Sequence, residues 1–207
     1  MKVGDIKIEA LRLMFAGVPA LMNADNLYGY ESRSEFELYL SMMPGSIHRC
    51  IDNIVSRCIL PVKRKELSLT GVERRGRFYR FDISGSDFYE VSRVIKMSED
   101  EYDGDHPYRM EGETLVLLAP DEASSYTLLY HPKIPHKEYK DTDELVGIPD
   151  EIAVLMPYFI KGELYREDEA GEAAEAMSWF EQRLASLGET RTEKQGSVAC
   201  LYDQGVL

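Results

Sequence analysis

FYRFDI at residues 78–83 alternates apolar and polar side chains, which is the period of a β-strand with one buried face. Three further runs repeat the pattern: FYEVSRVIKM at 88–97, ETLVLLA at 113–119 and SYTLLYH at 125–131. Glycines and prolines separate the runs at intervals typical of tight turns. The pattern predicts a small antiparallel sheet or sandwich over residues 66–131.

Two of these runs contain adjacent aromatic residues, Phe78 with Tyr79 and Phe88 with Tyr89. Neighbours in a strand point to opposite faces, so we expect one ring of each pair on each side of the sheet. An aromatic ring on the solvent-facing side of the sheet is explained by a protein interface, by a sugar-binding platform or by a sheet whose two faces are both covered. Between the strands, SEDEYDGDHP at 98–107 is predicted to be an exposed acidic loop.

Helical spacing precedes the strand-like region. The predicted helices cover residues 5–16, 34–43 and 46–58, and Ser34 with Glu37 forms a capping-box pattern at the second start. Pro44 and Gly45 are expected to break the chain between the second and third helices, because proline removes an amide donor and clashes with the preceding turn.

Helical spacing returns after the strand-like region. One helix is predicted over 150–167, with Pro157 either kinking it or beginning its main part. A second, alanine-rich helix is predicted over 169–187, with Gly188 as its C-cap.

This order predicts an α+β fold in which about five helices form one bundle and a β subdomain is inserted between them. The expected parts are the N-terminal helices (1–65), the β subdomain (66–131), the C-terminal helices (132–188) and an extended arm (189–207).

Charge is distributed unevenly along the chain. The net charge is -13, which argues against a protein that binds nucleic acid through a wide basic surface. Residues 141–207 contain 15 acids and 5 bases, whereas the band 63–80 contains seven bases and two acids. Both are read either as solvated faces or as surfaces that meet between subunits. In the second reading Arg74, Arg75 and Arg77 lie at a subunit or partner interface.

Motifs for known chemistry are missing from the sequence. No phosphate-binding glycine loop, zinc-protease motif or serine-hydrolase elbow is present, so we expect no enzymatic activity and no cofactor. Three cysteines without a C-x-x-C pair encode neither a disulfide framework nor a zinc site. The four histidines are scattered, which predicts no metal site. An EF-hand reading centred on Gly104 fails because Met110 would occupy the twelfth position.

Neither a signal-peptide core nor a membrane-spanning apolar run is visible, so we expect a protein made in a reducing, cytosol-like compartment and no membrane partner.

The run GIPDEIAVLMPYFIKGELYREDEAGEAAEAMSWFEQRLASL at 147–187 resembles the closing helices of tailed-bacteriophage head-to-tail adaptor (connector) proteins. In that family a segment like GELYREDE precedes an alanine-rich helix with an aromatic-Glu pair, here Phe180 and Glu181. The preceding order of helices, β insertion and strand before the last helices is also similar.

The resemblance implies a structural virion protein of the neck, assembled in the host cytoplasm. Such proteins form a ring, commonly of twelve copies, that binds the portal and a tail or second neck protein. DNA passes through the ring without specific binding, and the family has no catalytic residues. Two other readings stay open: a different phage neck or tail-completion protein, and a carbohydrate-binding module or non-viral enzyme that uses the tyrosine-rich sheet.

The segment 189–207 is too polar to build a core of its own, yet it ends with apolar residues. We therefore expect an interaction arm that adds to a partner surface, for example as a strand at a sheet edge. Its predicted contact residues are Val198, Leu201, Tyr202, Val206 and Leu207.

Overall fold

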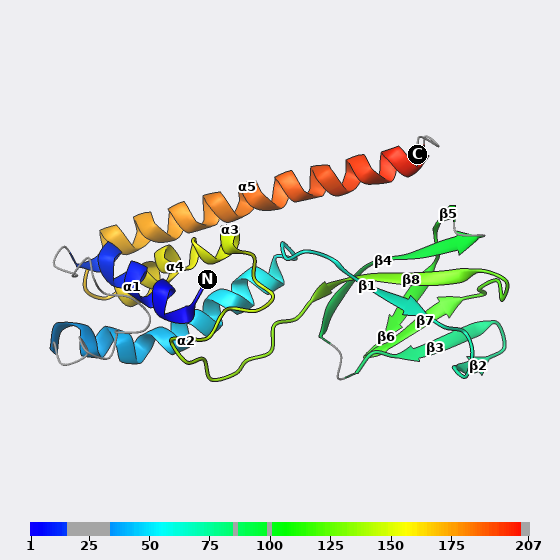
Figure 1. Ribbon diagram of the computed structural model, residues 1–207, viewed down its shortest axis with the longest axis horizontal. Helices are drawn as coiled ribbons and strands as arrows, with labels where there is room; N and C mark the ends of the chain where they lie inside the picture. The colour runs from blue at the N-terminus through cyan, green and yellow to red at the C-terminus, as the bar shows by residue number, and fades with distance from the viewer. Residues whose placement is uncertain (16–33, 85–86, 99–100, 204–207) are drawn as a thin grey trace. The chain divides into compact units, whose positions relative to one another are not determined.

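The computed structural model describes residues 1–15, 34–84, 87–98 and 101–203, by backbone alone at 34–35, 98, 101–102 and 189–203. The chain divides into two compact units, residues 1–57 with 136–195 and residues 58–135 with 196–207. Helices build the first unit and strands 63–132 build the second, so the α+β class is confirmed (Figure 1). The predicted β limits of 66 and 131 are thus narrower than the compact unit that contains the strands.

The helical unit contains α1 (Val3–Met14), α2 (Ser34–Ser56), α3 (Asp150–Ala153), α4 (Met156–Leu164) and residues 170–195 of α5 (Ala170–Asp203). α4 contacts both α1 and α2, and its Phe159 packs edge-on against Phe180 of α5 with ring centroids 5.1 Å apart. Gly162 of α4 allows α5 to approach closely, since a Cβ there would lie 3.2 Å from the Ala173 carbonyl oxygen. The core is formed by fully buried apolar residues of all these helices, among them Ile6, Leu11, Met43, Ile47, Ile54, Ile152, Ile160, Phe180 and Leu184.

The N-terminus of α1 is capped by backbone groups. The amides of Val3 and Gly4 donate to the carbonyl oxygens of Asp143 and Asp141 at 2.9 and 2.8 Å. These bonds satisfy two of the amides that the first turn of a helix leaves unpaired. They also fasten the segment after the β unit to the first helix.

Two of the predicted helix limits are wrong. α2 continues through Pro44, because Met43 and Ile47 on either side of it are buried in the core and outweigh the lost hydrogen bond. α5 continues through Gly188 to Asp203, so residues 189–203 are helical and not extended. The Glu, Arg, Lys and Gln residues after Gly188 are good helix formers, and they offset the cost of one interior glycine.

The expectation for Pro157 is confirmed. A short helix, α3, ends at Ala153, and α4 begins at Met156 with Pro157 in its first turn. Proline is tolerated there because the first amides of a helix have no intrahelical acceptor.

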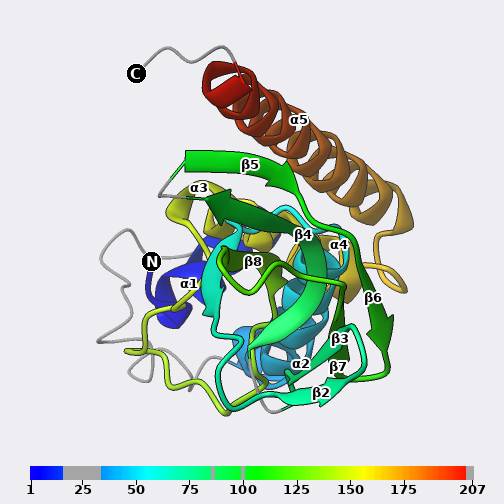
Figure 2. The ribbon, with the colours of Figure 1, turned by 90° about the vertical axis from the view of Figure 1, so that its right-hand side faces the viewer.

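The described residues of the β unit form eight strands: β1 (Lys63–Leu67), β2 (Glu73–Arg75), β3 (Phe78–Asp82), β4 (Phe88–Ser98), β5 (Glu101–Asp105), β6 (Tyr108–Glu111), β7 (Thr114–Leu118) and β8 (Ser125–Pro132). They form two four-stranded antiparallel sheets with the orders β1-β8-β4-β5 and β2-β3-β7-β6 (Figure 2). Inward residues of both sheets make one apolar core: Leu67, Tyr79, Phe81, Ile83, Val94, Leu115, Leu117, Tyr126, Leu128 and Tyr130. The unit is therefore a small sandwich.

Two details of the β unit differ from the sequence-based expectation. The acidic loop predicted at 98–107 contains strand β5, which pairs with β4. β1 begins before residue 66, and its side chains at 63–66 are all exposed. Four charged residues in succession hide the alternation that marks the other strands.

Candidate interaction surface

The basic band at 63–80 lies on β1, β2, β3 and their connections, all within the β unit. One of its predicted contact residues, Arg74, is engaged inside that unit. Its guanidinium donates to Glu122 at 2.6 Å and to the Gly76 carbonyl oxygen at 3.0 Å, and it lies over the ring of Tyr79. The Tyr79 hydroxyl donates to the same Glu122 oxygen at 2.7 Å, which raises the pKa of Tyr79 and lowers the pKa of Glu122. Arg74 is thus held at the edge of the sandwich core by Tyr79 and Glu122.

Arginine and glutamate side chains form a network of ion pairs on the outward face of the second sheet. Arg75 contacts Glu73 at 2.7 Å, and Arg80 contacts both Glu73 and Glu111. Hydrogen bonding from Arg80 is the main reason that the pKa of Glu111 is lowered. The same face includes Arg109, which pairs with Glu111. Arg75 is therefore exposed but already neutralised by its own chain.

The third predicted contact residue, Arg77, lies in the turn between β2 and β3 and is exposed. Its carbonyl oxygen accepts a hydrogen bond from the Ala119 amide at 2.8 Å. The preceding Gly76 has a φ of +62°, a left-handed conformation that glycine adopts without strain. The turn fixes the position of the Arg77 backbone at the surface.

The start of the basic band, on β1, carries three of its seven bases, which were not among the contact residues predicted from the sequence. Lys63 is engaged by Asp87, which also accepts a hydrogen bond from Tyr130 at 2.8 Å. The hydrogen bond from Lys63 is the main cause of the lowered pKa of Asp87. Arg64 and Lys65 form no ion pair with any described residue and are exposed. The sequence signal for these exposed bases is the run KRKEL, in which four charged residues precede the buried Leu67.

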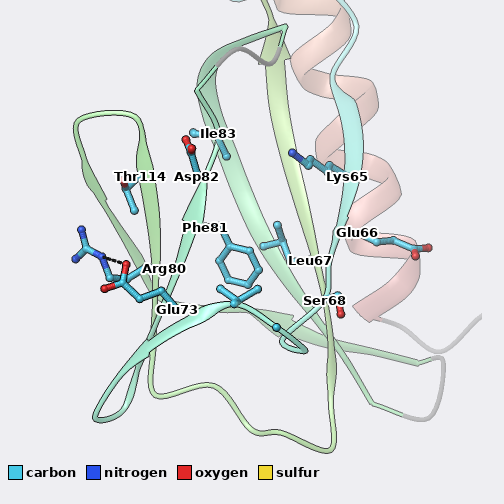
Figure 3. Close-up of a pocket in the computed structure, with 12 residues that line it drawn as sticks. Lys65, Glu66, Leu67, Ser68, Glu73, Arg80, Phe81, Asp82, Ile83 and Thr114 are labelled. Atoms are coloured by element: carbon cyan, nitrogen blue, oxygen red, sulfur yellow. Dashed lines mark ion pairs between the residues drawn. The ribbon is translucent and has the colours of Figure 1, made fainter.

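A cavity of about 590 Å³ opens beside β1, between that strand and β3. Leu67 and Phe81 face each other across it, with Lys65 and Asp82 at its upper part (Figure 3). Other lining residues are Glu66, Ser68, Gly71, Val72, Glu73, Arg80, Ile83 and Thr114. The cavity thus combines apolar walls with charged residues of both signs.

Acidic residues of the C-terminal third are paired mainly with bases of the same helical unit. Glu163 accepts two hydrogen bonds from Arg49 at 2.9 Å, and Glu181 accepts one from Arg57. Asp141 is buried and contacts Lys7 at 2.6 Å. Part of the predicted acidic surface is therefore paired within the helical unit.

The predicted contact residues of the C-terminal arm fall partly outside the described residues. Val198, Leu201 and Tyr202 lie on α5, where the structure gives the backbone alone. Val206 and Leu207 lie beyond its last described residue.

The histidines are divided between the units. In the helical unit, His48 and His136 stack with ring centroids 4.8 Å apart, and His136 contacts Asp52 at 2.8 Å. In the β unit, burial lowers the pKa of His106 and of His131. Within the described parts of the chain, no group of three or more metal-ligating side chains occurs.

Both described cysteines have raised thiol pKa values. Burial raises the pKa of Cys50 well above its ordinary value. Burial, aided by a hydrogen bond to Glu90, raises the pKa of Cys58 to about 11. Since the thiolate is the reactive form, neither thiol is set up for catalysis.

The expectation for adjacent aromatic residues is confirmed at Phe78 and Tyr79. Tyr79 is buried in the sandwich core, whereas Phe78 is exposed and lies under the guanidinium of Arg109. Phe88 likewise packs against the core while Tyr89 is exposed.

Neither a protein-family model nor a curated protein sequence matches this chain. Over the described residues, none of the helices has the length and apolar character needed to cross a membrane.

Proposed function

We propose that the protein is a structural subunit of a tailed-bacteriophage virion, a ring-forming head-to-tail adaptor that joins the portal to the tail. In this role it is located in the neck of the particle and makes no covalent change in any substrate. Its partners are further copies of itself, the portal protein and a tail or second neck protein. DNA passes along the ring without being held.

The observation that carries this proposal is the helix pair built from the segment with the adaptor-like sequence. Residues 147–187 contain α3, α4 and the first half of α5, and α4 packs on α5 through Gly162, Phe159 and Phe180. Such a close contact between two helices gives a rigid support for a surface that must be repeated many times in a ring.

Charge and surface chemistry support the same role. The net charge of -13 opposes binding of DNA phosphates, as suits a channel through which the genome must move freely. The sandwich adds exposed strands of strong local charge, which favour contacts between proteins.

The decisive experiment mixes the purified full-length protein with the portal protein of the same phage and measures particle mass, followed by negative-stain imaging. We expect a ring of many copies attached to one end of the portal, with each component alone as the control. A chain that stays monomeric in the presence of its portal contradicts the proposal. Binding to a finished adaptor ring, without binding to the portal, would identify a different neck protein.

A further inference from the structure

The two outer strands of the first sheet carry opposite charges. β1, with the sequence KRKEL, and β5, with the sequence EYDGD, end the strand order β1-β8-β4-β5. β1 has three bases and one acid, and β5 has three acids and no base. One sheet thus presents a basic edge and an acidic edge.

The basic edge is available for a partner. Lys63–Glu66 are all exposed, and Arg64 and Lys65 have no ion-pair partner among the described residues. Lysines on an edge strand normally prevent indiscriminate pairing with other strands. These bases do not repel an acidic strand, because its charges neutralise those of β1.

The acidic edge has exposed carboxylates that can change partners. The side chains of Asp103 and Asp105 are 46% and 60% exposed. Asp103 contacts Lys96 at 2.6 Å, and Asp105 is 4.0 Å from Arg93. Exposed ion pairs of this kind contribute little to stability, so a new partner at the edge can share these acids at small cost.

The cavity beside β1 provides a reason for a strand to add there. Leu67, Phe81 and Ile83 line its mouth, and they keep 5%, 9% and 4% of their surface exposed. A strand that extends the sheet at β1 would lie over this mouth and shield those apolar walls further.

We propose that β5 of one copy adds to β1 of the next, so that the first sheets of neighbouring copies continue into each other. This inference rests on the proposed ring function and identifies its subunit contact. The contact joins two different surfaces of the same chain, which is the heterologous arrangement that closes a ring. It also gives each outer strand the backbone hydrogen bonds that a terminal strand lacks.

A charge swap tests the contact. The basic-edge variant carries Arg64→Glu and Lys65→Glu, and the acidic-edge variant carries Asp103→Lys and Asp105→Lys. Each variant alone brings like charges together at every contact, so we expect assembly in the presence of portal to need at least ~10-fold more protein. An equal mixture restores opposite charges at every contact, because each variant's β5 then meets the other variant's β1. We therefore expect the mixture to assemble near the wild-type concentration.

The matched control is Lys133→Glu with Lys140→Glu, which changes the net charge as much as the basic-edge variant at exposed positions outside both strands. Circular dichroism checks that every variant is folded, and particle mass gives the extent of assembly. Rings that form equally well from both edge variants overturn the edge contact while leaving the adaptor function standing. Loss of assembly in both variants without recovery in the mixture also overturns it. A wild-type chain that forms no assembly with its portal refutes the adaptor function, and with it the contact.

Discussion

The ion pair between Lys7 and Asp141 is buried in the helical unit. Nζ and Oδ1 are 2.6 Å apart, and the side chains are only 11% and 3% exposed. At an effective dielectric constant of ~20, charges at this distance attract by about 6 kcal/mol, which roughly offsets the cost of removing both from water. The pair as a whole is therefore close to neutral for stability, whereas one member alone is costly.

Replacing Asp141 by leucine leaves the Lys7 ammonium buried without its counter-charge. Breaking a buried pair in this way costs about 3–5 kcal/mol. We expect the lower end of that range, because the small exposure of Lys7 lets its ammonium reach some water. For a chain of this length a loss of about 3 kcal/mol corresponds to a fall in Tm of roughly 6–12 °C.

The assay is urea unfolding followed by helical circular dichroism, with Lys7→Met, Asp141→Leu and the double variant compared in a thermodynamic cycle. Each single variant should lose several kcal/mol, and the double variant should recover most of the loss. Glu9→Gln is the control, since Glu9 pairs with Arg12 in an exposed position on the same helix and should cost less than ~1 kcal/mol. A loss below ~1 kcal/mol in Asp141→Leu, or simple addition of the two single losses, would refute the reasoning.

Three further predictions concern the helix pair, the sandwich and the C-terminus. Gly162→Val should destabilise the helical unit by about 1–3 kcal/mol in chemical unfolding, because α5 lies against that position, whereas Gly171→Ala has open space around it and should stabilise by up to ~1 kcal/mol. Burial and the hydrogen bond to Asp87 raise the pKa of Tyr130 to about 12, so its contribution is complete below pH ~10 and is lost as pH rises towards 12. In Tyr130→Phe, unfolding followed by tyrosinate absorbance should lose this part of the alkaline decline, and an unchanged profile would count against the assignment. Deleting residues 189–207 should abolish attachment to the portal in a pull-down while Tm stays nearly constant; a truncated protein that still binds the portal removes the proposed role of this segment.

Sequence periodicity predicts this fold best where the local preference of a segment agrees with its burial in the core. The alternating runs around Phe81 and Leu115 become strands because each has one face in the sandwich core. Pro157 begins a helix because the first helical turn does not need its amide. Local and tertiary preferences agree at these sites.

Prediction fails where a tertiary contact or a run of charge outweighs the local rule. Pro44 lies inside α2 because Met43 and Ile47 on either side of it are in the core, which no local pattern reveals. Gly188 resembles a C-cap, yet the helix-forming residues after it carry α5 onward. β1 is masked by KRKE, since an edge strand needs few apolar residues.

The same limit applies to the basic band, because the sequence does not reveal which of its bases are paired within their own chain. Arg74, Arg75 and Lys65 look equivalent in composition, but strand register decides which of them meets an acid of the same chain. Strand register places Arg74 opposite Tyr79, and Glu122 accepts a hydrogen bond from each of them. Lys65 lies opposite Leu128 and forms no ion pair with a described acid. A base that already has a partner must give it up before it can bind another protein, and a base without one does not. Availability for assembly is therefore a property of the paired sheet, and among the described strands the bases without an ion-pair partner are Arg64 and Lys65 of β1, while Arg77 in the turn after β2 also has none.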